Sequence, residues 1–175
     1  MHLGFSSMNT QFDPPPPVLA RYLEERGFES LWYGEHSHIP CSRRTPYPGG
    51  GEMPDPYKQM MDPYVSLMAA AAATSKLRLG TGIALLMERD VFSQAKTIAT
   101  LDHLSGGRVI IGTGVGWNEE EFRNVSDKPW NKRYGVLRET VAAMRALWRD
   151  DEAAYHGEYV DFDPVWLYPK PKQAG

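Results

Sequence analysis

Residues 77–117 read LRLGTGIALLMERDVFSQAKTIATLDHLSGGRVIIGTGVGW, and this stretch decides the fold. Its first part, residues 77–86, is an apolar run without helical period, which favours a buried strand. Asp90 can cap a helix, and the glycines at 106–107 can end it in the left-handed conformation. Residues 108–114 (RVIIGTG) are a second, β-branched run. Two apolar strands joined by a helix indicate parallel strands that are buried on both faces.

The same order of strand, helix and strand precedes this stretch. Residues 3–7 and 30–34 predict two short strands, with a helix between them that Gly27 ends. Asp62 then begins a helix that leads into the strand at residue 77, with proline at the first helical position. Because crossovers between parallel strands are right-handed, we expect at least four parallel strands with helices packed on the outer face of the sheet.

The last third of the chain predicts one amphipathic helix and one small hairpin. Residues 157–169 (GEYVDFDPVWLYP) alternate between apolar and polar, as in a hairpin or an edge strand. The chain thus holds about four to five βα units, whereas a closed barrel has eight strands in about 250 residues. The predicted fold class is α/β, the N-terminal half of a (β/α)8 TIM barrel, with residues 1–175 as one domain truncated at its C-terminus. The apolar residues of the amphipathic helix recur at helical spacing: Leu137, Val141, Met144 and Trp148.

Composition argues against several classes of protein. The 175 residues are 42% hydrophobic, so we expect a packed core. The net charge is −3, with positive and negative residues interspersed, so we expect no nucleic-acid partner. The single cysteine, Cys41, excludes an internal disulfide and fits a reducing compartment. The N-terminus lacks the pattern of a signal peptide, and no apolar run is long enough to span a bilayer. These observations predict a cytoplasmic protein without a membrane partner.

Residues 35–61 (EHSHIPCSRRTPYPGGGEMPDPYKQMM) form a long loop rich in proline and glycine. Loops of this length inside a compact domain are usually lids or binding loops. In parallel sheets and barrels, ligands bind at the carboxyl ends of the strands. Because the loop follows a strand, we expect it to roof a site at that edge of the sheet.

Several motifs then resemble one family in register. LGTGIALL, AKTIATLDHLSGGRVIIGTGVGWNEEEF, RYGVLRETVAAMRALW and HGEYVDFDPVWLYPKP resemble the bacterial luciferase-like superfamily of flavin-dependent oxidoreductases, and within it the probable F420-dependent branch. The resemblance implies a TIM barrel that uses F420 or FMN to reduce or oxygenate a small organic substrate. The alternative is a non-catalytic fragment, or a half-barrel that dimerises without turnover. A homodimer would cover the two sheet edges that a half-barrel leaves open.

The positions that follow the strands supply the candidate site residues. His36 is the candidate catalytic residue, as a proton donor, a base or a substrate contact, and a loop histidine bonded to backbone is the alternative. The resemblance places the family's non-proline cis peptide at Gly82–Ile83, and we predict that this bond or its neighbour is cis or distorted. Trp117 is expected to wall the cofactor pocket, with core packing as the alternative. The expected cofactor-binding residues are Gly80, Thr81, Gly82, Ile83, Gly114 and Trp117.

Other motifs are given structural roles. The stretch GTGVGW at 112–117 lacks the third glycine of a dinucleotide-binding fingerprint. His38 could pair with His36, but no third ligand stands at metal spacing, so no metal is predicted. Residues 102–108 (DHLSGGR) are expected to form a structural helix end, and the three glutamates at 119–121 a solvated helix start near a positive dipole.

Overall fold

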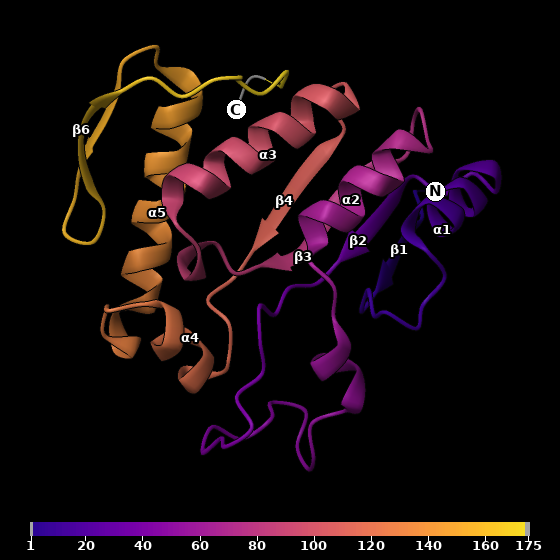
Figure 1. Ribbon diagram of the computed structural model, residues 1–175, viewed down its shortest axis with the longest axis horizontal. Helices are drawn as coiled ribbons and strands as arrows, with labels where there is room; N and C mark the ends of the chain where they lie inside the picture. The colour runs from indigo at the N-terminus through magenta and orange to yellow at the C-terminus, as the bar shows by residue number, and fades with distance from the viewer. Residues whose placement is uncertain (1, 174–175) are drawn as a thin grey trace.

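Four parallel strands form one sheet in the computed structural model, which describes residues 2–173. The strands are neighbours in chain order, and each pairs in parallel with the next (Figure 1). The predicted parallel α/β arrangement is therefore confirmed, and each strand falls within two residues of its expected bounds. The strands are β1 (Gly4–Ser7), β2 (Ser30–Tyr33), β3 (Arg78–Ala84) and β4 (Val109–Thr113).

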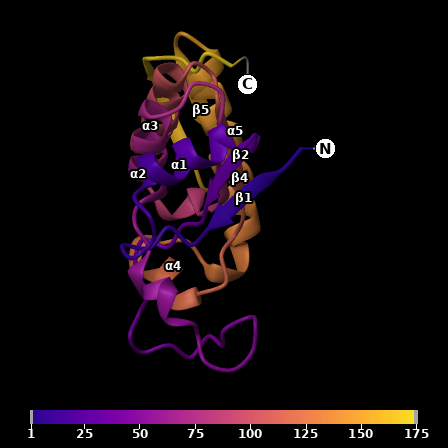
Figure 2. The same cartoon turned by 90° about the vertical axis from the view of Figure 1, so that its right-hand side faces the viewer.

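The helices that join these strands are α1 (Pro16–Glu25), α2 (Pro63–Ala72) and α3 (Val91–Ser105). Figure 2 shows α2 and α3 together on one side of the sheet, as expected for right-handed crossovers. Asp90 caps α3 by accepting from the Ser93 N–H at 2.8 Å, and Gly106 ends it with a φ of 81°. These capping predictions are confirmed.

The core lies between the sheet and the helices. Leu31, Leu79 and Val109 pair across three adjacent strands, point to the helical side, and are at most 6% exposed. Phe5, which pairs with Leu31 on the edge strand β1, is 38% exposed. On the opposite face the Trp32 indole covers Gly80, where an added methyl group would overlap the ring.

The C-terminal part contains α4 (Glu119–Val125), α5 (Arg133–Arg149) and an antiparallel hairpin of β5 (Ala153–His156) and β6 (Asp161–Val165). The hairpin starts before the predicted range of 157–169, because residues 157–160 form its turn. The reason is Glu139 on α5, whose carboxylate accepts three backbone N–H groups of that turn at 2.6–3.1 Å.

Three short 3-10 helices complete the fold: η1 (Asp55–Gln59), η2 (Leu86–Glu88) and η3 (Trp130–Lys132). The structural role predicted for residues 102–108 is confirmed, because the buried Asp102 carboxylate accepts from the Lys172 and Gln173 backbone N–H groups. Within residues 2–173, no helix has the length and apolarity needed to cross a membrane.

Candidate active site

A cavity of about 190 Å³ lies where β2, β3 and β4 end. Its lining includes His36 after β2, Gly82 and Ile83 on β3, and Trp117 after β4. In Figure 1 the arrowheads of the strands point to the end of the molecule that holds the 35–61 loop and α4. We expected His36, Gly82, Gly114 and Trp117 to converge on one cavity, and three of them line it, whereas Gly114 does not.

The peptide bond between Gly82 and Ile83 is cis, as predicted. The pairing of β3 with β4 is irregular in this segment, with the register shifting between Thr81 and Ala84. Gly82 and Ile83 therefore present backbone that is bulged away from a regular strand at the floor of the cavity.

The remaining predicted cofactor residues lie outside the cavity lining. A methyl group on Gly114 would overlap the Ile83 side chain, so Gly114 supports the cavity floor by allowing close contact. Gly80 lies beneath Trp32. Thr81 is fully buried, and its hydroxyl donates to the Gly112 carbonyl at 2.9 Å.

His36 forms a short hydrogen bond with a buried carboxylate. Its Nδ1 lies 2.6 Å from Oε2 of Glu121 on α4, and the two side chains are 9% and 1% exposed. With the carboxylate accepting from Nδ1–H, the other ring nitrogen, Nε2, is the one left for a ligand. The expectation that residues 119–121 form a solvated helix start is wrong for Glu121, because α4 turns this residue inward beside the fully buried Phe122.

Aromatic rings surround His36 on the loop side. The ring centroids of Tyr57 and Trp117 lie 5.4 and 5.9 Å from that of His36. Tyr47 contacts both of these rings in edge-to-face geometry, and its hydroxyl lies 3.3 Å from that of Tyr57. Because Tyr47 and Tyr57 belong to the 35–61 loop, these contacts hold the loop over the cavity, as predicted.

Further hydrogen bonds anchor the loop at its middle and at its C-terminal end. The Glu120 carboxylate on α4 accepts from the backbone N–H groups of Arg44 and Thr45 at 2.6 and 3.2 Å. The Met61 N–H donates to the Asn9 carbonyl at 2.8 Å. The roof of the cavity is thus tied both to α4 and to the segment after β1.

A buried ion pair joins the ends of β2 and β3. Glu35 is 4% exposed, and its carboxylate accepts from the Leu85 N–H at 2.7 Å and from Nε of Arg89 at 2.5 Å. Arg89 also donates to Asp62, the cap of α2, at 2.6 Å. Burial raises the pKa of Glu35, while the Arg89 charge opposes that shift. The network fixes the backbone on which His36 stands.

A third buried carboxyl, that of Glu88 in η2, lies behind the cavity wall. Burial and the neighbouring Glu121 and Glu35 carboxylates raise its pKa to about 8. The carboxyl therefore holds its proton at neutral pH. Its Oε1 would lie 3.5 Å from a methyl group on Gly116, which lines the cavity.

The other histidine of the loop, His38, has different partners from His36. His38 contacts Ser37 and, through Nε2, the Asn124 side chain at 2.9 Å. Within residues 2–173, no group of three or more histidine, cysteine or acidic side chains is arranged to hold a metal ion.

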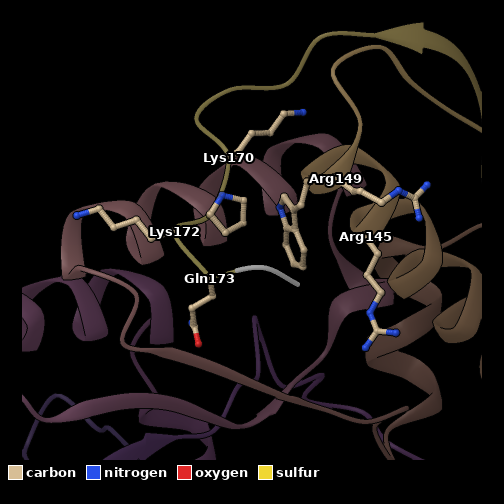
Figure 3. A pocket seen from close by; sticks show the side chains of 7 residues that line it. Arg145, Arg149, Lys170, Lys172 and Gln173 are labelled. Carbon is tan, nitrogen blue, oxygen red and sulfur yellow. The ribbon is translucent and has the colours of Figure 1, made fainter.

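A larger cavity of about 760 Å³ lies elsewhere, beside α5 (Figure 3). Its basic side chains are partly engaged: Lys170 Nζ donates to the carbonyls of Leu147 and Asp150, and Arg149 pairs with Asp150. None of the predicted site residues lines it. The candidate active site is therefore the smaller cavity at the strand ends.

The profile of one family, luciferase-like monooxygenase, matches residues 17–175. An uncharacterized protein of Mycobacterium tuberculosis (strain ATCC 25618 / H37Rv) is 46% identical over 176 residues, which cover 99% of this chain and 62% of that protein. The F420-dependent glucose-6-phosphate dehydrogenase of Amycolatopsis mediterranei (strain U-32) is 30% identical, over 99% of this chain and 49% of that enzyme.

The FMNH(2)-dependent dimethylsulfone monooxygenase of Pseudomonas putida is 34% identical over 60% of this chain and 29% of that enzyme. Among solved structures, the monooxygenase RslO1 from Streptomyces bottropensis matches with a TM-score of 0.79 and 26% identity, over 99% of this chain and 50% of that one. The chain therefore spans at most 62% of the length of these relatives.

Proposed function

We propose, from the premise that this chain belongs to the luciferase-like monooxygenase family, that it forms part of the active site of an oxidoreductase that uses F420 or FMN on a small organic substrate. The observation that carries the proposal is the meeting of His36, the Gly82–Ile83 backbone and Trp117 around one cavity. One relative is an F420-dependent enzyme and another is an FMNH(2)-dependent enzyme, so the proposal includes both cofactors.

The cavity suits the planar ring of such a cofactor better than the whole molecule. Its floor is the bulged backbone at Gly82. A methyl group added to Gly82 would have its nearest neighbour, an atom of Trp32, 3.7 Å away, so no atom crowds this position. Its volume of about 190 Å³ is below the ~300–1,000 Å³ of complete ligand pockets. We infer that these residues contact the ring, and that the rest of the cofactor site requires more chain, as in the longer relatives.

When bound, the cofactor supplies the redox chemistry, which is hydride transfer for F420 and also oxygen activation for FMN. The chain supplies orientation, shielding and a proton. Trp117 and Tyr57 exclude water from one side of the cavity. His36 moves a proton at Nε2, while Glu121 holds Nδ1 and stabilises the imidazolium whenever it forms.

Ligand titration followed by NMR tests this assignment. FMN and F420, each added to the labelled protein, should shift the amide signals of Ile83 and Trp117 and the ring signals of His36. We expect binding in the micromolar range or tighter only for a chain that continues as the relatives do. Shifts confined to the basic cavity around Arg145 and Lys170 would show phosphate-tail binding and would overturn the assignment.

A matched pair of tryptophan variants sharpens the test. Trp117→Ala should weaken ring binding up to about tenfold, because an aromatic contact contributes about 0.5–1.5 kcal/mol. Trp166→Ala removes a ring that is 75% exposed directly after β6 and should leave affinity unchanged. Equal affinities for the two variants would exclude Trp117 from the ring site.

A further inference from the structure

The cavity at the strand ends is lined mostly by apolar and aromatic side chains. These side chains are Met8, Tyr57, Met60, Ile83, Leu85 and Trp117. Met60 reaches over the end of β2, where its Cε would lie 3.2 Å from a methyl group added to Gly34. Thioether and aromatic groups suit irregular apolar surfaces, so a ligand in this space is in contact with carbon, sulfur and ring surface.

The charged groups of the lining are balanced within the protein. The Glu35 carboxylate pairs with Arg89, and Arg89 also binds Asp62 at 2.6 Å. His36 has the Glu121 carboxylate 2.6 Å from its Nδ1, so a proton gained by the ring is balanced within this pair. Within residues 2–173, no lysine or arginine side chain lines the cavity.

The three basic side chains of the 35–61 loop do not line this cavity either. Arg43 donates from Nη1 to the Pro40 carbonyl at 3.3 Å, and Lys58 donates to the Asp55 carboxylate at 2.6 Å. Arg44 lines a separate cavity of about 570 Å³ together with acidic residues of α4. An anionic group that entered the candidate active site would therefore lose hydration without meeting a cation of this part of the chain.

We propose that this site prefers an uncharged substrate with an apolar or aromatic body, and that it discriminates against substrates that carry a phosphate, sulfate or carboxylate group. The apolar body packs against the methionine and aromatic side chains of the lining. Its polar group meets Nε2 of His36, the ring nitrogen that Glu121 leaves free. This inference rests on the proposed function, because it names the substrate class of the same cavity.

Two probes of nearly equal size and shape separate charge from fit: benzamide, which is uncharged, and benzoate, which is an anion. Each is titrated into the protein without cofactor, and binding is followed by the NMR signals of the His36 ring and the Trp117 indole. Benzamide should bind at least roughly tenfold more tightly than benzoate, because burying an unpaired charge costs more than burying an amide. Benzoate that binds as tightly as benzamide, or benzamide that shifts neither signal, would overturn the proposal.

Met60→Lys tests whether the lining is the source of this preference. Both side chains are unbranched, and the substitution places an ammonium group at the cavity. Affinity for benzoate should rise about tenfold, the effect of one hydrogen bond to a charged group, while affinity for benzamide stays near that of the wild type. Unchanged benzoate binding in Met60→Lys would contradict the proposal.

Gln59→Lys is the matched control. It adds the same charge one residue earlier, where the side chain bonds to that of Gln11 and does not line the cavity. Both affinities should stay at the wild-type values. If Gln59→Lys raised benzoate binding as much as Met60→Lys, the net charge of the molecule would set the preference, and the proposal would be wrong.

The outcome for the substrate class is separate from the outcome for the cofactor. No cofactor takes part in the probe titrations, so loss of the preference for benzamide leaves the FMN and F420 titration unaffected. A preserved preference for benzamide together with failure of the FMN and F420 titration would refute the proposed function alone.

Discussion

Glu88→Gln should change how the stability of the protein depends on pH. Burial and the carboxylates of Glu121 and Glu35 raise the pKa of Glu88 from 4.5 to about 8 in the folded state. In the unfolded chain this environment is absent, so the carboxyl titrates near its ordinary value. Below that value Glu88 is protonated in both states, and the variant should match the wild type.

Between pH 4.5 and about 8 the unfolded chain releases the Glu88 proton while the folded protein keeps it. The folded state then binds more protons, so the wild type loses stability as the pH rises through this window. The loss ends near pH 8, where Glu88 ionises in the folded protein as well. At about 1.4 kcal/mol per pH unit, the whole window corresponds to roughly 5 kcal/mol. A domain is typically stable by only about 5–15 kcal/mol.

Urea unfolding followed by circular dichroism, at several pH values across the window, measures this difference. The free energy of unfolding of Glu88→Gln should rise relative to the wild type from pH 4.5 to about 8 and then stay constant. Glu25→Gln, which removes an exposed carboxyl on α1, should follow the wild type throughout. Parallel pH profiles for Glu88→Gln and the wild type would refute the reasoning.

Three further substitutions test packing and polar contacts. Gly80→Ala should destabilise the protein by about 1–3 kcal/mol through overlap with Trp32, and Trp32→Leu in the same chain should recover part of the loss in urea unfolding. Arg89→Met should cost about 3–5 kcal/mol, because it leaves the buried Glu35 carboxylate without its charge partner, and a loss below 1 kcal/mol would contradict a buried ion pair. Glu139→Ala should speed hydrogen exchange at the three turn amides of the β5–β6 hairpin and lower stability by about 1–3 kcal/mol, with unchanged exchange as the contrary result.

Much of the fold could be predicted from local patterns. Apolar runs, capping residues and the glycines at 106–107 determined the order of strands and helices, because each of these signals acts within a few residues. The resemblance to the luciferase-like family is confirmed as well. It also indicated the cis bond at Gly82–Ile83, which no local propensity predicts.

The partners of the site residues could not be predicted in the same way. Glu121 is one of three consecutive glutamates, and only the orientation of α4 decides which of them is buried. The pattern Asn118-x-x-Glu121 even suggests a capping box, in which the glutamate would reach back to the helix start rather than across to His36. Tyr47 and Tyr57 lie in a loop without periodicity, so no signal in the sequence placed them beside Trp117.

The 35–61 loop has a consequence for how freely this scaffold can vary. The loop lies between β2 and β3, so the chain from Ser30 to its partner Arg78 is longer than the chain from Gly4 to its partner Ser30. Closing the longer chain costs only about 0.5 kcal/mol more in chain entropy, because this cost grows with the logarithm of length. Insertions and deletions in the middle of this loop, away from Glu35 and Met61, therefore add little chain-entropy cost to the pairing of the sheet beneath it. Selection can change what enters the cavity without first stabilising the rest of the protein.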